Sequence, residues 1–279
     1  MIDPPASLTL SLPARSYLFV PADRPERFDK ALASGADAII VDLEDSVAPA
    51  RKAAAREHLA QWQSPNHSVY LRINGAKTEW FREDLELCRN PGVCGIVLSK
   101  AEEVAELACV AETVQKKPIL PIIESAQGFA NLAALAREPG VQRLLFGPLD
   151  LQLDLGIEGD GAELLYFRSH LVLVSRLAGL RSPVDGVTTE IRDSSVVCAD
   201  AQAARRFGFG GKLCIHPNQV EAVNSAFSPT EHEIQWAKQV MAAWQKAAGG
   251  VALLDGKMVD RPIARRAESI LEARRNKAN

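Results

Sequence analysis

Several carboxylate residues follow directly after apolar segments of the sequence. Residues 38–47 read AIIVDLEDSV, so Glu44 and Asp45 end a run that begins like a buried strand. Glu124 ends a second apolar run, and Asp150 follows a third. Grouped carboxylates raise one another's pKa unless a cation lies among them. Oxygen ligands without a His or Cys pair favour a hard ion such as Mg²⁺, which takes one or two protein carboxylates, waters and substrate oxygens.

One basic residue also lies at the end of an apolar run. Arg72 lies in the segment LRIN, at the end of another apolar run. A guanidinium there would clamp an anionic substrate or stabilise a developing enolate oxygen. Together these residues predict a Mg²⁺-dependent enzyme acting on a small oxoacid or hydroxyacid. Plainer interpretations stay open, since Arg72 could pair with Glu44 and Glu124 could cap the next helix.

The elements that must position these residues alternate regularly. Short apolar strands are followed by longer amphipathic stretches from about residue 15 to 247, in eight consecutive pairs. This order predicts an α/β fold, a closed (β/α)8 TIM barrel with a C-terminal helical extension. An open doubly wound sheet is the alternative, but the chain has neither G-x-G-x-x-G after the first strand nor a Walker A sequence. We therefore predict a catalytic barrel over residues 1–249 and an extension over residues 250–279.

In such a barrel, the carboxyl ends of the strands and the loops after them build the active site. Asp185 is expected to be a polar anchor within the barrel, and His216 to fix the last loop. Polar residues at the predicted strand ends are Glu44, Asp45, Arg72, Asn74, Ser99, Lys100, Glu124, Ser125, Asp150, Asp185 and His216.

Composition narrows the classes of protein that fit. The chain has 279 residues and a net charge of -3, which argues against nucleic acid as a partner. No apolar run approaches the ~18 residues that span a membrane, and the N-terminus does not resemble a signal peptide. The five cysteines include no C-x-x-C pair, so we expect reduced thiols in a cytoplasmic protein. The expected partner is a small-molecule substrate.

A family resemblance extends over most of the chain. The segments that carry it are FVPADRPERFDKA, VDLEDSV, LRIN, PIIESAQGF, FGPLDL, GKLCIHPNQ and, near the end, DGKMVDRP. Together they resemble the citrate lyase beta-subunit-like group of the HpcH/HpaI aldolase superfamily, which includes malyl-CoA and citramalyl-CoA lyases. The resemblance implies a barrel that forms a homotrimer or hexamer and uses Mg²⁺ to cleave or form a carbon–carbon bond.

The resemblance also implies roles for individual residues. Glu124 and Asp150 correspond to the two direct metal ligands, and Glu124 also belongs to the substrate-binding set. Arg72 is similar to the arginine that contacts the oxoacid or the enolate oxygen. Glu44 and Asp45 resemble the catalytic pair that holds metal-bound waters.

Three further residues are implied outside this group. Asp260 looks like the catalytic acid/base that a neighbouring subunit brings over the site, which would make the extension a cover for that site. Arg24 and Lys30 are similar to basic residues near the phosphates of coenzyme A.

The implied substrate is a 3-hydroxyacyl-CoA such as malyl-CoA, citramalyl-CoA or citryl-CoA, cleaved to an oxoacid and acetyl-CoA. Alternatives are a metal-dependent pyruvate or oxoacid aldolase without a thioester substrate, and a beta subunit of a citrate lyase complex. A class I aldolase would use Lys100 or Lys212 in a Schiff base, which requires a lysine in an apolar pocket rather than an acidic mouth.

Overall fold

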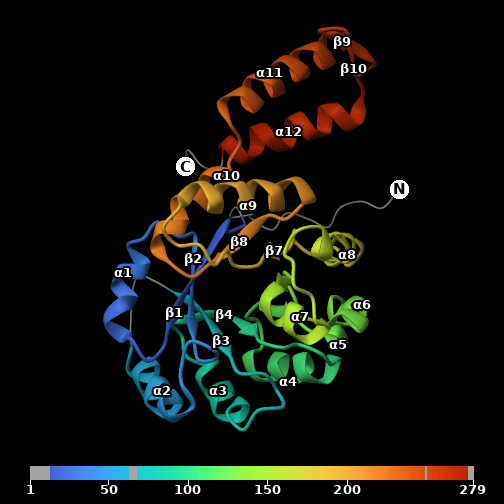
Figure 1. Ribbon diagram of the computed structural model, residues 1–279. Helices are drawn as coiled ribbons and strands as arrows, with labels where there is room; N and C mark the ends of the chain where they lie inside the picture. Colours follow the sequence, from blue (N-terminus) through green and yellow to red (C-terminus); the bar gives the residue numbers. More distant parts are fainter. Residues whose placement is uncertain (1–12, 63–67, 249, 276–279) are drawn as a thin grey trace. The chain divides into compact units, whose positions relative to one another are not determined.

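The computed structural model describes residues 13–62, 68–248 and 250–275 (Figure 1). It divides into two compact units. One unit contains Ala14–Asn224, and the other contains the described residues from Ser225 onward. None of the helices formed by these described residues has the length and apolar character to cross a bilayer.

The first unit is a closed barrel of eight parallel strands, which confirms the predicted (β/α)8 fold. The strands follow one another around the barrel in chain order, and β1 closes it by pairing with β8 as well as with β2. Their bounds are β1 Ser16–Pro21, β2 Ala38–Asp42, β3 Val69–Ile73, β4 Val93–Leu98, β5 Ile119–Ile123, β6 Leu145–Phe146, β7 Val184–Asp185 and β8 Gly211–Cys214.

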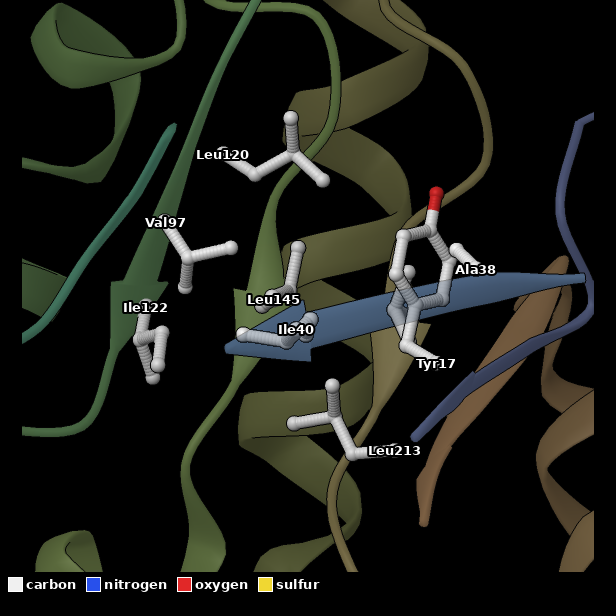
Figure 2. Packing of buried hydrophobic residues seen from close by; sticks show 9 residues of the cluster. Tyr17, Ala38, Ile40, Val97, Leu120, Ile122, Leu145 and Leu213 are labelled. Atoms are coloured by element: carbon white, nitrogen blue, oxygen red, sulfur yellow. The ribbon is translucent and has the colours of Figure 1, made fainter. Parts of the chain in front are cut away.

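Side chains that point into the barrel form its core. Figure 2 shows Ile40, Ile122, Leu145 and Leu213 directed toward one another from separate strands. Because side chains alternate along a strand, the inward positions recur at every second residue. The whole buried cluster contains Tyr17, Ala38, Ile40, Val97, Leu120, Ile122, Leu145, Val184 and Leu213.

The same alternation places polar residues above this core. Two positions beyond Ile40 is Asp42, and two beyond Ile122 is Glu124. Arg72 follows Tyr70, which packs against the core, in the same way. These three side chains therefore lie at the carboxyl end of the barrel because apolar residues fill the inward positions below them.

Helices cover the outside of the barrel (Figure 1). Their bounds are α1 Phe28–Leu32, α2 Lys52–Gln61, α3 Phe81–Leu87, α4 Val104–Val114, α5 Ala126–Ala130, α6 Leu132–Leu135, α7 Pro148–Leu155, α8 Leu165–Leu177, α9 Ser194–Phe207 and α10 Val220–Ala226. Several begin at residues that satisfy free backbone N–H groups. Glu103 and Glu106 form a capping box at the start of α4, and the Asp193 side chain caps α9.

The second unit has its own small core. Helix α11 (Glu231–Lys246) and helix α12 (Arg261–Arg275) pack with a hairpin of β9 (Ala252–Leu254) and β10 (Lys257–Val259). Ala237, Val240, Val259 and Ala267 are buried between them. The sequence assigned α11 to the eighth barrel unit, whereas the helix that directly follows β8 in the structure is the short α10.

Candidate active site

A cavity of about 340 Å³ opens at the carboxyl ends of the barrel strands. Apolar side chains form part of its wall, and acidic residues with one arginine form the rest. It is lined by Phe19, Pro21, Asp42, Asp45, Ser46, Arg72, Ile122, Glu124, Phe146, Gly147, Pro148, Leu149, Asp150, Val187, Leu213 and Ile215.

Asp42 and Arg72 form a bidentate ion pair in this cavity. The Arg72 Nε and Nη2 atoms each lie 2.6 Å from a carboxylate oxygen of Asp42. The backbone N–H groups of Glu44 and Ser46 donate to the same carboxylate at 2.9 and 3.2 Å. Burial by itself would raise the pKa of Asp42, but the charge and hydrogen bonds of Arg72 outweigh it and hold that pKa below its ordinary value.

The remaining nitrogen of Arg72 faces two more carboxylates. Its Nη1 atom lies 3.0 Å from Glu44 and 3.8 Å from Asp45, and its guanidinium stacks over the ring of Phe19 at 4.6 Å. Burial would lower the pKa of Arg72, but Asp42 raises it far above the ordinary value, so the guanidinium stays charged. Burial raises the pKa of Glu44 to about 7 although Arg72 opposes this change.

Glu124 is buried at the end of β5 and is held from two sides. The backbone N–H of Lys100 donates to its Oε1 at 2.7 Å, from a left-handed conformation with φ of 49°. On the other side a Cβ atom at Gly147 would collide with the Glu124 side chain, so only glycine leaves room for this carboxylate. Burial, followed by the charges of Asp150 and Glu44, raises the pKa of Glu124 to about 8.

Asp150 lies in the first turn of α7, close to the ammonium of Lys100. The Lys100 Nζ atom is 3.9 Å from Asp150 and 3.4 Å from Glu44. Burial works against the charge of Lys100, but the surrounding carboxylates outweigh it and raise its pKa. Both residues are partly exposed, unlike Asp42 and Glu124.

A buried lysine beneath the cavity holds the loop that carries Glu44. Lys52 donates to the backbone oxygens of Leu43 and Glu44 at 2.8 and 2.9 Å, and to Asn74 Oδ1 at 2.8 Å. Asn74 donates in turn to Asp84 at 2.6 Å. The loop after β2 is therefore fixed by side chains from α2, α3 and the end of β3.

The donor set fits a hard divalent cation. Over the described residues, no group of three or more His, Cys, Asp or Glu side chains is arranged to hold a metal by protein atoms alone. Glu124 and Asp150 offer two carboxylates, which is the protein share that Mg²⁺ commonly takes. Burial and the charges of Asp150 and Glu44 raise the pKa of Glu124, and a bound cation would oppose both effects.

The structure brings together most of the predicted site residues. Arg72, Asp45, Glu124 and Asp150 line the cavity, and Glu44 reaches it through its contact with Arg72. Two other predicted residues are outside the lining: Arg24 is exposed in the loop after β1, and Lys30 is exposed on α1. Asp260 belongs to the second unit, where its side chain accepts the N–H of Ile263 at 3.2 Å at the start of α12.

Asp185 is a polar anchor, but on the outer face of the barrel wall rather than within the barrel. Its neighbour Val184 belongs to the inward core, so Asp185 points the other way, toward α8. It pairs with Lys212 at 3.2 Å and Arg168 at 3.1 Å, beside a separate cavity of about 640 Å³. His216 fixes its loop as expected, because its Nδ1 accepts the N–H of Asn218 at 3.2 Å.

Sequence reasoning gave no role to Asp42 and did not single out Lys52. The signal for Asp42 was available, because a carboxylate ending the fully apolar run AIIV needs a cation when it is buried. Arg72, on the next strand, pairs with it in register. No comparable signal identifies Lys52, which occupies the start of an ordinary amphipathic helix.

Known proteins resemble this chain in sequence and in fold. Residues 15–217 match the model of the HpcH/HpaI aldolase/citrate lyase family. A (3S)-malyl-CoA thioesterase from Cereibacter sphaeroides is 36% identical over 257 residues, covering 89% of this chain and 90% of that protein. A citrate lyase subunit beta-like protein from Deinococcus radiodurans is 34% identical, covering 96% and 98%. The crystal structure of CitE from Mycobacterium tuberculosis with magnesium, acetoacetate and coenzyme A has a TM-score of 0.84 at 33% identity, covering 95% and 99%.

Replacing Asp42 by Asn should destabilise the barrel. Arg72 would lose the bidentate partner of its buried charge and keep only its contacts with Glu44 and Asp45, so we expect a loss of about 3 kcal/mol in the free energy of unfolding at pH 7, measured by urea denaturation. The native pKa of Asp42 is below the unfolded value, so the stabilisation by its charge is complete above that value and is lost as pH falls through the native pKa.

The stability difference between wild type and Asp42→Asn should therefore be constant above about pH 5 and shrink in more acidic solution. Asp29→Asn, an exposed change on α1, is the matched control and should leave stability unchanged. Equal stability of Asp42→Asn and wild type at pH 7 would contradict this account of the ion pair.

Proposed function

Because this chain belongs to the HpcH/HpaI aldolase/citrate lyase family, we propose that it is a Mg²⁺-dependent carbon–carbon lyase. Its substrate would be a 3-hydroxyacyl-CoA such as malyl-CoA, citramalyl-CoA or citryl-CoA, cleaved to an oxoacid and acetyl-CoA. The observation that carries this proposal is the acidic cavity in which Glu124 and Asp150 lie with the anchored guanidinium of Arg72.

Glu124 and Asp150 would hold the metal, and Glu44 and Asp45 would hold its bound waters. When bound, Mg²⁺ acts as a Lewis acid and as a template for the substrate hydroxyl and carboxylate. The oxygen-only donors and the position of both carboxylates in the wall of one cavity support this assignment. So does the magnesium in the related CitE structure.

Arg72 would stabilise the oxyanion that develops during the reaction. Two of its nitrogens are committed to Asp42 and its plane is stacked on Phe19, so its orientation is set before substrate arrives. A donor organised in this way contributes roughly 3 kcal/mol to stabilisation of the transition state. A lysine could not replace it, because an ammonium lacks the fork that binds Asp42 and a ligand together.

In the cleavage direction the substrate hydroxyl would give its proton to a carboxylate of the cavity, and its carbon would become the carbonyl of the oxoacid. The bond between that carbon and the carbon next to the thioester breaks, and its electron pair remains on the acetyl-CoA fragment as an enolate. Asp260 of a neighbouring subunit would protonate this enolate carbon, or remove a proton from acetyl-CoA in the condensing direction. A homotrimer or hexamer would then be the active form, with the second unit covering the neighbour's cavity.

Arg24 and Lys30 would contact the phosphates of coenzyme A. Both are exposed, on the loop after β1 and on α1, and neither lines the 340 Å³ cavity. Basic side chains outside the reacting centre suit a phosphate-bearing part of the substrate that remains near solvent.

The Schiff-base alternative is poorly supported by the two lysines considered for it. The pKa of Lys100 is raised by the carboxylates around it, which favours its charged, non-nucleophilic form. Lys212 is paired with Asp185 on the outer face of the barrel wall. Two alternatives would use the same cavity: a metal-dependent aldolase acting without a thioester, and a subunit of a citrate lyase complex. The substrates that the protein accepts distinguish them from the proposed lyase.

A substrate panel tests the proposal. It should contain malyl-CoA, methylmalyl-CoA, both citramalyl-CoA enantiomers and citryl-CoA, each with Mg²⁺ or with EDTA, while oxoacid, acyl-CoA and free CoA are measured. We expect Mg²⁺-dependent formation of an oxoacid and an acyl-CoA in equal amounts, the acyl-CoA being propionyl-CoA from methylmalyl-CoA and acetyl-CoA from the other substrates. Release of free CoA and the intact hydroxyacid would instead indicate thioester hydrolysis, the activity named for the Cereibacter sphaeroides relative. Turnover that persists in EDTA would contradict the metal assignment.

Replacing Glu124 by Gln should abolish Mg²⁺-dependent turnover while the barrel stays folded. The amide keeps the shape of the side chain but removes the charge, so we expect at least about a 100-fold weaker response to Mg²⁺. Isothermal titration of Mg²⁺ and circular dichroism measure binding and folding separately. Glu112→Gln, a change at an exposed position on α4, is the control. Full activity of Glu124→Gln would remove Glu124 from the metal site.

Complementation tests whether Asp260 acts on a neighbouring subunit. Asp260→Asn and Glu124→Gln should each be inactive alone, because one lacks the acid/base and the other the metal ligand. Co-expressed with separate affinity tags and purified as mixed oligomers, the two variants should regain activity, since some sites then combine an intact Glu124 with an intact Asp260. Mixed oligomers that remain inactive would contradict action across subunits.

A further inference from the structure

Lys100 places an ammonium beside two carboxylates of the candidate site. Its Nζ atom lies 3.4 Å from Glu44 and 3.9 Å from Asp150, while its backbone N–H is bonded to Glu124. A single residue thus contacts both proposed metal ligands and one of the proposed holders of metal-bound water. Neither the family comparison nor the mechanism above gives its side chain a role.

Asp42, Glu44, Asp45, Glu124 and Asp150 form a carboxylate cluster. Within the described residues, two cations contact this cluster, and they are held very differently. Arg72 is buried and bonded twice to Asp42 at 2.6 Å. The ammonium of Lys100 is half exposed and approaches its carboxylates only at long ion-pair distances, from a flexible stem. Such a contact is weak, because solvent screens it and the side chain loses entropy in forming it.

The charges around the cavity explain why a second cation is needed. Arg72 is paired with Asp42 and also contacts Glu44 and Asp45, whereas Lys100 is the cation that contacts Asp150 among the described residues. One guanidinium and one ammonium balance the carboxylates of this cluster only in part. A divalent ion between Glu124 and Asp150 would supply more charge at shorter distance, and would repel the ammonium.

We propose that Lys100 is the resident cation of this cluster in the metal-free protein, and that Mg²⁺ displaces its ammonium from Glu44 and Asp150 when it binds. The inference rests on the proposed function, because the ion is the same one. Lys100 therefore lowers the affinity of the free enzyme for Mg²⁺. While the metal is absent, its ammonium reduces the repulsion between the carboxylates. It is a positioning residue, since it acts on the carboxylates rather than on substrate.

The test measures binding of MgCl₂ alone, by isothermal titration and by the thermal shift between EDTA and saturating Mg²⁺. Lys100→Met should bind Mg²⁺ roughly 3- to 10-fold more tightly than wild type, because the competing charge is gone. Its melting temperature should fall in EDTA but not in saturating Mg²⁺. Methionine is unbranched like lysine, so the left-handed backbone at residue 100 is strained no further.

Lys116→Met is the matched control, since Lys116 is an exposed lysine after α4 and the net charge changes equally. It should bind Mg²⁺ as wild type does. Lys100→Arg keeps the charge and should not bind more tightly than wild type. Displacement itself is measured by reductive methylation followed by mass spectrometry: Mg²⁺ should increase modification of Lys100 several-fold and leave Lys116 unchanged.

Two results would overturn the inference. Mg²⁺ affinity of Lys100→Met equal to or below that of wild type would show that Lys100 does not compete with the metal. Methylation of Lys100 that is unchanged or reduced by Mg²⁺ would show that the ammonium is not displaced. If wild type itself binds no Mg²⁺, the proposed function fails together with this inference, whereas normal wild-type binding confines the failure to Lys100.

Discussion

The ion pair of Asp42 and Arg72 is the interaction on which the cavity depends. Two charges are held inside a barrel filled by apolar side chains, which is favourable only when they are paired and fully hydrogen-bonded. Asp42 meets that condition through both oxygens, each bonded to Arg72 and to a backbone N–H of the following loop. The same carboxylate therefore fixes the guanidinium, the end of β2 and the loop that carries Glu44.

The alternation of side chains along a β-strand determines both the core residues and the cavity residues above them. Inward positions that hold Ile40 and Ile122 near the middle of the barrel hold Asp42 and Glu124 at its end. A one-residue shift in either strand would turn the carboxylate toward the helices and an apolar side chain into the cavity. Asp185 shows that outcome in the same barrel, because its inward neighbour is Val184 and its charge is satisfied on the outer face.

This periodicity explains how far the sequence could predict the structure. Eight apolar runs specify the barrel, and parallel strands bring Arg72, Glu124 and Asp150 to one end, so the predicted constellation is found in one cavity. The direction in which the Asp185 side chain points depends on packing that no local pattern records. So does the division of the chain into two units after Asn224. For the same reason the hydrogen bonds by which Lys52 holds the loop after β2 were not predicted, since its partners lie in other segments of the chain. The catalytic roles themselves remain predictions.

The two cations of the candidate site are suited to different tasks by how they are held. Arg72 keeps its charge and position because Asp42 is bonded to it at short distance, so it can face a developing anion without reorganising. Lys100 neutralises part of the acidic cluster through long contacts near solvent, so a stronger cation can take its place at little cost. A cavity with one fixed and one exchangeable positive charge can remain folded without its metal and still bind it. This combination follows from where each side chain leaves the barrel wall: Arg72 from within a strand, and Lys100 from the loop beyond one.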